Sequence, residues 1–243
     1  LGFEKGLFVS SGLMGNQISL LIHNDPGTEV ITPHDSHIKN YEHGAAAFLS
    51  RVQFRDAEHT DGELNLEYVE KLILKSKVHK PIIKTVSIEN THLASGGSIV
   101  PFDSIESLSK IVREHGLKLH VDGARIWHAI EEDKNNMNYG DFCDSLTFCF
   151  SKAPIGSMLL GSMEFITEAR EYRKKLGGGM RQVGVIASMA KTALQGRESI
   201  LEDHAKAKKV YDFLNVNLNN EKIQSIVYKG TNMIFLNIKN EED

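Results

Sequence analysis

The chain has 243 residues, of which 41% are hydrophobic and 25% are charged, as in ordinary globular proteins. Its formal net charge of −4 argues against a dedicated nucleic-acid surface, which is usually basic. No apolar run reaches the about 18 residues of a transmembrane helix, so we expect no membrane span and no membrane partner.

Strand-like and helical segments alternate through the first part of the chain. Strands separated by helices predict βαβ units, and therefore an α/β fold with a mostly parallel sheet covered on both faces. The residue patterns predict, in chain order, a helix opening within 10–17, a strand over 28–32, a helix over 66–76, a strand over 81–90, a helix over 103–116, strands over 117–125, 146–150 and 157–162, and a helix over 164–175.

The helix expected over 103–116 has signals at both of its ends. Asp103 is predicted to be the N-cap, and Glu106 stands three residues further on, as in a capping box. Gly116 is expected to end the helix.

The pattern changes after about residue 196. A long amphipathic helix over 198–218 is followed by two segments, 223–230 and 231–238, that are typical of antiparallel strands. We therefore expect a large domain over 1–195 and the beginning of a small, incomplete α+β domain over 196–243.

The two cysteines, Cys143 and Cys149, lie six residues apart on either side of an apolar run. This spacing is not that of a metal or redox motif, so we expect reduced and mostly buried thiols, a reducing compartment and no metal site.

Polar residues follow three of the expected strands. They are Glu89–His92, Asp122–Arg125 and the pair Ser151–Lys152. In open parallel sheets ligands bind outside the carboxyl ends of the strands, so these residues are expected to meet at one rim.

Lys152 is the residue on which a functional reading depends. A lysine at the end of a strand is usually a solvated surface residue. Beside an acid, an arginine and imidazoles, however, it can form a Schiff base with a carbonyl cofactor such as pyridoxal 5'-phosphate (PLP). PLP also needs an acid facing its pyridine nitrogen, a flat group stacked on its ring and a cradle for its phosphate.

Each of these needs has a candidate. Asp122 is the acid, unless it only forms a turn, and Arg125 could reach the ring hydroxyl or a substrate carboxylate. The small residues of 10–17 precede a helix whose free N–H groups could hold the phosphate, although such segments are common. His37 is the stacking candidate and His92 a second imidazole, while a lone histidine is more often structural.

Taken together, these motifs resemble those of low-specificity L-threonine aldolases. The segments "LFVSSGLMGNQ", "DSHIKNYEHGAAAFLS", "SIENTHLASGGSIVP", "HGLKLHVDGARIWHA" and "RKKLGGGMRQVGVIA" occur in the order of that family over nearly the whole chain. The resemblance implies a fold-type I, aspartate aminotransferase-like large domain. It also implies a PLP-dependent lyase that cleaves L-threonine to glycine and acetaldehyde by a retro-aldol step.

The resemblance assigns the central roles residue by residue. It implies that Lys152 is the Schiff-base lysine, Asp122 the partner of the pyridinium nitrogen and Arg125 the nearby arginine. It further implies that His37 stacks on the cofactor ring and that His92 contacts the substrate. A base for the substrate β-hydroxyl could be His37, His92 or a bound water.

The phosphate end of the cofactor is assigned in the same way. Gly12 and Leu13 match the phosphate-binding pair of the family, with Ser11 adjacent. Lys174 and Arg181 match basic residues expected to reach the cofactor phosphate or the pocket, from the same or a neighbouring subunit.

The resemblance also implies a substrate group and an assembly. Glu42 matches an acid near the substrate pocket, where His92 and Arg125 are also expected. Family members are commonly homotetramers with sites shared between subunits, and we expect a cytoplasmic enzyme that acts on a small β-hydroxy amino acid.

The sequence departs from the family pattern in three places. Leu13 stands where the family usually has threonine, which removes a hydroxyl donor to the phosphate. Lys152 runs directly into Ala153-Pro154, where the family has about three further, glycine-rich residues; either the loop is shorter or these residues are missing from the sequence, and we favour the second. The opening segment of the family and the rest of its small domain are also absent.

Two other readings remain open. The chain could be another PLP enzyme of the same fold, such as a β-eliminating lyase, a hydroxymethyltransferase-like enzyme or an aminotransferase, because the fold alone does not separate these. It could also be a non-catalytic relative, if the loop after Lys152 is truly shortened.

Overall fold

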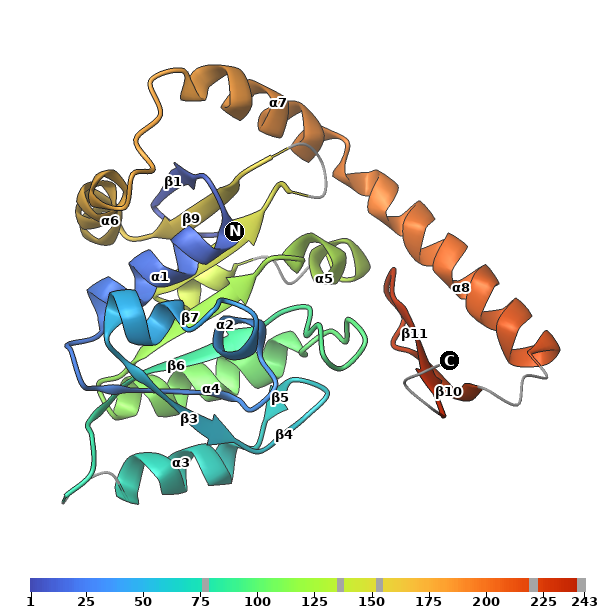
Figure 1. Ribbon diagram of the computed structural model, residues 1–243, viewed down its shortest axis with the longest axis horizontal. Coiled ribbons are helices and arrows are strands. Elements are labelled where there is room, and N and C mark those ends of the chain that lie inside the picture. Colours follow the sequence, from blue (N-terminus) through green and yellow to red (C-terminus); the bar gives the residue numbers. More distant parts are fainter. Residues whose placement is uncertain (76–78, 135–137, 152–154, 219–222, 240–243) are drawn as a thin grey trace.

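The computed structural model describes residues 1–75, 79–134, 138–151, 155–218 and 223–239. At its centre lies a seven-stranded sheet with the order β1-β9-β8-β7-β6-β2-β3 (Figure 1). The pairs from β3 to β8 are parallel, whereas β9 runs antiparallel to β8 and to β1. The predicted mostly parallel α/β sheet is therefore confirmed. The strands of this sheet are β1 (Lys5–Val9), β2 (Glu29–Pro33), β3 (Gln53–Ala57), β6 (Ile83–Glu89), β7 (Lys118–Gly123), β8 (Ser145–Cys149) and β9 (Ser157–Gly161).

The inner strands form where they do because helices cover both of their faces. β2 is buried along its whole length, and β7 is buried at every position except Lys118. Their buried positions include polar residues, Glu29 and Thr32 on β2 and His120 and Asp122 on β7, beside the apolar ones. On β1, Leu7 and Val9 pack into the core on one face and Phe8 into the core on the other, as the two-residue period of a strand requires.

Helices α1 and α6 cover one face of the sheet, and α3 and α4 cover the other (Figure 1). Ile18 of α1 and Phe165 of α6 share one apolar cluster. Val69 of α3 and Ile105 of α4 belong to the larger cluster on the opposite side. The helices are α1 (Gly12–His23), α2 (His37–Asn40), α3 (Leu66–Leu74), α4 (Phe102–Glu114), α5 (Ile126–Glu132), α6 (Met163–Lys175), α7 (Val183–Gln195) and α8 (Ile200–Asn217).

The start of α4 differs from the prediction. Its N-cap is Pro101, and no side chain caps the helix there, so the assignment of Asp103 as N-cap is wrong. With φ at −58°, Pro101 lets the helix begin at Phe102, which places Asp103 in the first turn. A carboxylate there is still favourable, because it faces the positive end of the helix dipole. Gly116 follows the helix with φ at +66°, the left-handed conformation expected of a terminating glycine.

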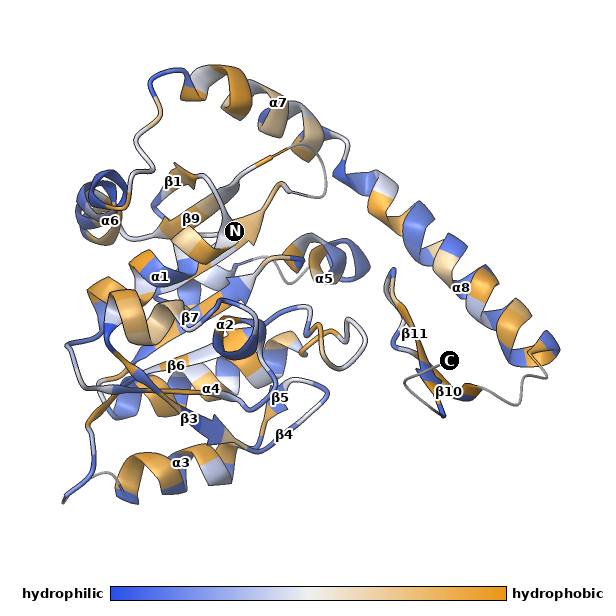
Figure 2. Cartoon of the chain, in the orientation of Figure 1, coloured by the Kyte–Doolittle hydropathy of each residue, from blue (hydrophilic) through white to orange (hydrophobic). Residues whose placement is uncertain are grey.

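The chain leaves the sheet through α7 and α8, with the short helix Arg197–Ser199 between them. The last strands, β10 (Ile223–Tyr228) and β11 (Ile234–Ile238), pair antiparallel in a sheet of their own, as predicted. Figure 2 shows that α7 is largely apolar and that α8 carries mixed apolar and polar residues. That a separate domain begins at residue 196 stays a prediction.

Four short elements complete the description. β4 (His59–Thr60) and β5 (Glu63–Leu64) form a small hairpin, and residues Ala46–Ser50 and Tyr139–Asp141 form single turns of π- and 3₁₀-helix. No helix in the described part of the chain combines the length and the apolar character that crossing a membrane requires.

Candidate active site

Two buried carboxylates lie side by side at the carboxyl ends of the central strands. Glu89 ends β6 and is paired in register with Asp122 on β7, and both are at most 3% exposed. The strand-end residues of β6 and β7 therefore meet at one rim, as predicted from the parallel arrangement.

Glu89 anchors the backbone on either side of this rim. Its carboxylate accepts the backbone N–H of His37 at 2.8 Å and that of Leu93 at 3.0 Å. Burial, together with the charge of Asp122, raises the pKa of Glu89 to about 7. This side chain thus fixes the start of α2, which carries His37, against the end of β6.

Two amide side chains of α1 hold the carboxylates of the site. Asn16 donates to Asp122 Oδ2 at 2.9 Å and to Glu42 Oε1 at 2.8 Å, and Gln17 donates to Glu42 Oε2 at 2.8 Å. Asp122 Oδ1 also accepts the backbone N–H of Ala124 at 3.1 Å. Each carboxylate is therefore held by two donors in a fixed orientation.

His37 stands beside these acids with an open side. Its Nδ1 lies 3.7 Å from Glu42 Oε1, and its side chain is 39% exposed. The neighbouring Glu42 raises the pKa of His37, and the charges of Asp122 and Glu89 add to this effect. Burial raises the pKa of Glu42 in turn, while His37 opposes that rise. The pair can therefore hold a proton between them.

The amino end of α1 points at the same rim. Ser11 is its N-cap and accepts the N–H of Met14 at 3.1 Å, which leaves other first-turn N–H groups for an anion. A Cβ at Gly12 would lie 2.7 Å from Cys149 Sγ, and one at Gly15 would lie 2.6 Å from Thr147 Cγ2. Glycine at these positions is what allows α1 to approach β8 so closely. Leu13, in the first turn, is 37% exposed.

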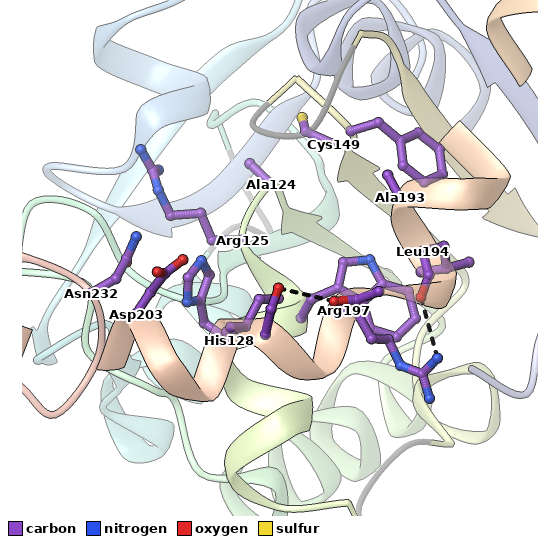
Figure 3. A pocket seen from close by; sticks show the side chains of 14 residues that line it. Ala124, Arg125, His128, Cys149, Ala193, Leu194, Arg197, Asp203 and Asn232 are labelled. Atoms are coloured by element: carbon purple, nitrogen blue, oxygen red, sulfur yellow. Dashed lines mark hydrogen bonds between the residues drawn. The ribbon is translucent and has the colours of Figure 1, made fainter. Parts of the chain in front are cut away.

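Arg125 lines a cavity next to this rim. It precedes α5 and, with Cys149, Asp203 and Asn232, lines a cavity of about 330 Å³. Figure 3 shows Arg125, Asp203 and Asn232 on one side of this cavity and Cys149 on another. The structure therefore places Arg125 where a small polar ligand could be accommodated.

His92 lies in a different environment from His37. Its ring is fully buried, with Nδ1 2.9 Å from Ser95 Oγ and Nε2 3.3 Å from Asp35 Oδ1. Burial lowers the pKa of His92 to about 4. Both ring nitrogens face protein groups.

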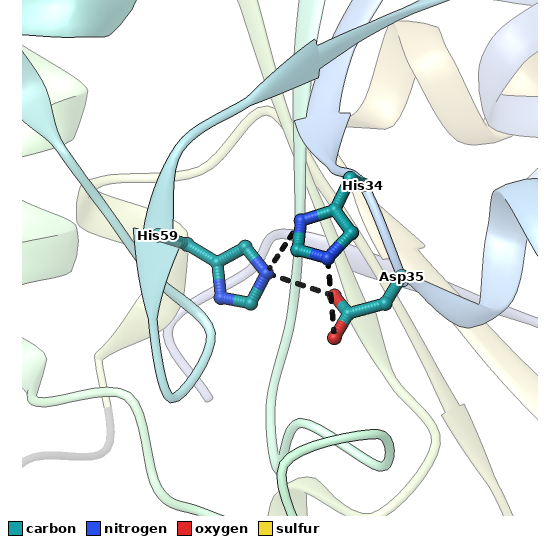
Figure 4. Close-up of side chains that lie close together, drawn as sticks. All are labelled: His34, Asp35 and His59. Carbon is teal, nitrogen blue, oxygen red and sulfur yellow. Dashed lines mark hydrogen bonds and ion pairs between the residues drawn. The ribbon is translucent and has the colours of Figure 1, made fainter.

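Asp35 also contacts two further histidines, in a cluster that could in principle hold a metal ion (Figure 4). Its Oδ1 lies 2.9 Å from His59 Nε2, which is 3.2 Å from His34 Nδ1. The backbone N–H of Gly62, however, donates to His59 Nδ1 at 3.1 Å. A neutral His59 must then carry its proton on Nε2, where a metal would need a lone pair. We therefore interpret this cluster as a hydrogen bond from His59 Nε2 to His34 Nδ1, with Asp35 Oδ1 at ion-pair distance from both His59 and His92.

Three predicted residues remain to be accounted for. Lys152 lies outside the described residues, and so does the question of the shortened loop after it. Lys174, in the last turn of α6, and Arg181, before α7, are both exposed. Their expected reach to the cofactor phosphate stays a prediction.

The sequence reasoning missed several residues of this region, among them Asn16 and Arg173. Asn16 lies within the segment 10–17, but nothing in the sequence indicates that its amide joins Asp122 to Glu42. Arg173 of α6 donates to the carbonyl of Phe8 at 2.8 Å, near the start of α1. Burial lowers its pKa, with a further contribution from Arg170. In the sequence it is one of several basic residues on a helix, so no signal distinguishes it.

Comparisons with known proteins agree with this geometry. The model of the beta-eliminating lyase family matches residues 1–239. The probable low-specificity L-threonine aldolase 2 of Arabidopsis thaliana is 39% identical over 247 residues, which cover 98% of this chain and 69% of that protein. The low specificity L-threonine aldolase of Escherichia coli K12 is 34% identical over 252 residues, covering 99% and 72%.

Solved structures share the fold. A putative L-allo-threonine aldolase from Listeria monocytogenes superposes with a TM-score of 0.81 at 22% identity, covering 98% of this chain and 66% of that one. A putative aromatic amino acid beta-eliminating lyase/threonine aldolase from Exiguobacterium gives a TM-score of 0.81 at 21% identity. This chain spans 65% of the Exiguobacterium protein's length.

The match to the family model over nearly the whole chain and the identity to curated threonine aldolases agree with the aspartate aminotransferase-like sheet. The chain belongs to the beta-eliminating lyase and threonine aldolase family, whose members are lyases that depend on PLP.

Proposed function

We propose that this protein is a PLP-dependent aldehyde-lyase that cleaves L-threonine and L-allo-threonine to glycine and acetaldehyde. The proposal rests above all on one observation: the buried Asp122, held by two N–H donors, shares a rim with the half-exposed His37 and its partner Glu42. The activities named for the relatives in Arabidopsis thaliana and Escherichia coli support it.

The described residues fit the cofactor. Gly12 and Gly15 allow the amino end of α1 to pack against β8, beside the rim that carries Asp122. The phosphate of PLP could therefore bind at the helix end while its protonated pyridine nitrogen faces Asp122. Asp122 and the first turn of α1 would hold PLP, and Lys152 would bind it covalently, as the family resemblance implies. When bound, PLP supplies an electron sink that weakens the Cα–Cβ bond of the substrate.

Asp122 would keep a proton on the pyridine nitrogen. Its carboxylate is buried, and Asn16 and the N–H of Ala124 hold it in one orientation. Removing the charge of Asp122 would keep the shape of the site. It would remove the site's ability to stabilise the negative charge that develops on the substrate.

His37 is the favoured base for the β-hydroxyl group of the substrate. Its Nδ1 faces Glu42, so the exposed part of the ring can accept the hydroxyl proton while Glu42 stabilises the imidazolium that results. His92 is less suited to this step, because its ring is buried and both nitrogens face protein groups.

A product analysis tests the reaction type. The full-length protein with PLP and L-threonine is expected to release acetaldehyde and glycine in equal amounts, and Lys152→Ala to release neither. Release of ammonia with a keto acid would instead support the β-eliminating reaction that the name of the matching family model carries. Failure of the wild-type protein to bind PLP would support a non-catalytic relative.

Assembly and location are part of the same proposal. We propose a homotetramer, supported by exposed apolar side chains along α7 and α8, which are Val185, Met189, Val210, Phe213 and Val216. The two cysteines are free thiols, which supports a cytoplasmic location. Residues 196–243 are proposed to begin the small domain.

A further inference from the structure

A chain of hydrogen bonds runs through the core from His23 to Asp122. His23 Nε2 lies 2.8 Å from Ser145 Oγ, which lies 2.8 Å from His120 Nδ1. His120 Nε2 lies 3.1 Å from Asn16 Oδ1, and the amide nitrogen of Asn16 reaches Asp122 at 2.9 Å. Three elements that are far apart in the sequence, α1, β7 and β8, thus contribute to one line of polar groups.

The carboxylates at one end of this chain determine which group donates and which accepts in every hydrogen bond along it. Both Asp122 and Glu42 present carboxylate oxygens, so the two amide hydrogens of Asn16 must face them. The oxygen of Asn16 then faces His120, whose Nε2 must carry a proton and donate it. A neutral His120 therefore accepts at Nδ1, and the hydroxyl of Ser145 donates there.

The donor and acceptor in the last hydrogen bond, between Ser145 and His23, follow from the same reasoning. Because the proton of Ser145 is committed to His120, the oxygen of Ser145 accepts from Nε2–H of His23. The ring of His23 is stacked on Phe165, with 4.9 Å between the ring centres. Burial lowers the pKa of His120 to about 3 and that of His23 to about 4, so both rings remain neutral at ordinary pH.

We propose that His120 and Ser145 are positioning residues that lock the side chain of Asn16 in the one orientation that holds Asp122 and Glu42 together. This inference deepens the proposed function and rests on it. Without a donor at His120, the amide of Asn16 could rotate by half a turn and place its oxygen against the carboxylates. In that orientation the amide oxygen of Asn16 would repel the carboxylate of Asp122. Glu42, the acid beside His37, would be held less firmly.

The test compares two substitutions of one residue. His120→Leu removes the donor to Asn16, whereas His120→Gln retains an amide N–H near the position of Nε2. The full-length His120→Leu protein is expected to bind PLP about three- to tenfold more weakly, since hydrogen bonds within a charged network are worth more than neutral ones. Its kcat for threonine should fall by about tenfold to a hundredfold with little change in KM. His120→Gln should recover most of both losses.

Two measurements separate this role from a merely structural one. In the protein without cofactor, nitrogen-15 NMR of the histidine rings should show His120 as the neutral Nε2–H form throughout pH 5 to 9. In the protein with PLP, the pH dependence of the visible absorbance band should shift in His120→Leu and return in His120→Gln. The matched control is His115→Leu at the end of α4, which should change neither.

The outcomes are distinct. A protonated or Nδ1–H form of His120, or an unaltered PLP affinity and absorbance profile in His120→Leu, would overturn the proposal even if threonine is cleaved. Failure of the wild-type protein to cleave threonine would overturn the proposed function, while the NMR and PLP titrations would still test the chain of bonds. If His120→Leu does not fold, Ser145→Ala removes the next donor at nearly constant volume and is expected to give smaller shifts in the same direction.

Discussion

At the scale of single residues, the site depends on acids that are buried but not isolated. Asp122, Glu42 and Glu89 lie close together, and each accepts hydrogen bonds from amide groups of α1 or of the backbone. Burial and mutual repulsion raise the pKa of Glu42 and Glu89, and a proton shared with His37 relieves that repulsion. Two substitutions test this arrangement.

Asp122→Asn should separate cofactor binding from chemistry. The amide keeps the volume of the side chain but cannot keep a proton on the pyridine nitrogen, so kcat for threonine is expected to fall by at least about a hundredfold. PLP content, measured after gel filtration, should remain close to that of the wild type. Activity equal to the wild type would remove Asp122 from the role proposed for it.

Glu42→Gln should shift the pH dependence of the reaction. Glu42 is the main cause of the raised pKa of His37, so its neutral analogue lowers that pKa. His37 acts as a base only when it is unprotonated, and the acidic limb of kcat/KM is therefore expected to move to lower pH, with a lower plateau because the base is weaker. Ser95→Ala, near His92, is the control, for which the limb should stay in place. A limb that moves to higher pH would contradict the assignment of His37.

At the scale of elements, α1 determines the geometry of the site. Its amino end carries the candidate phosphate cradle, its second turn carries Asn16 and Gln17, and its glycines pack against β8. A displacement of this helix would therefore disturb the cradle and the carboxylates together.

Gly15→Ala should destabilise the fold by forcing α1 away from β8. The new Cβ would meet Thr147 at 2.6–2.7 Å, and overpacking of this kind costs about 1–3 kcal/mol. Urea denaturation measures the loss. The second substitution Thr147→Ala removes both clashing atoms and should restore much of the stability. A double variant no more stable than Gly15→Ala alone would show that the clash is not the cause.

Leu13→Thr should strengthen cofactor binding. The first turn of α1 lacks the hydroxyl that the family usually has there, and a hydrogen bond to a charged group is worth about 1.5–3 kcal/mol. PLP is therefore expected to bind at least about tenfold more tightly, as measured by fluorescence titration. Leu13→Val has the branched shape of threonine without the hydroxyl, and should bind PLP like the wild type. Equal affinity in all three proteins would mean that backbone N–H groups already satisfy the phosphate.

At the scale of the whole molecule, α7 and α8 carry several exposed apolar side chains. Phe213 is 65% exposed and Val216 is 82% exposed, on a helix that extends from the sheet (Figure 1). The proposed homotetramer rests on this surface.

Phe213→Glu should weaken the proposed tetramer in the full-length protein. A charge in an apolar interface cannot be desolvated without a large cost, so sedimentation velocity is expected to show smaller species. Lys209→Gln changes the net charge by the same amount on the same helix and should leave the assembly intact. A wild-type protein that sediments as a monomer would refute the homotetramer directly.

The sequence by itself determined the class of fold and the principal acid of the site. The alternation of apolar strands and amphipathic helices predicts a parallel sheet, and strand ends in such a sheet share one rim, so the position of Asp122 at that rim follows from the sequence pattern alone. The motifs around Lys152, His37 and Arg125 added the family and the cofactor by resemblance.

Only the tertiary structure decided which side chains hold Asp122 and which histidine is exposed beside an acid. Asn16 and His120 are 104 residues apart, and their hydrogen bond exists because α1 packs on the sheet. His37 and His92 look alike in the sequence, yet one is half-exposed beside Glu42 and the other is buried against Asp35. Local patterns specify elements, whereas contacts between distant segments depend on how those elements pack, and no periodicity in the sequence encodes the partners of a polar side chain.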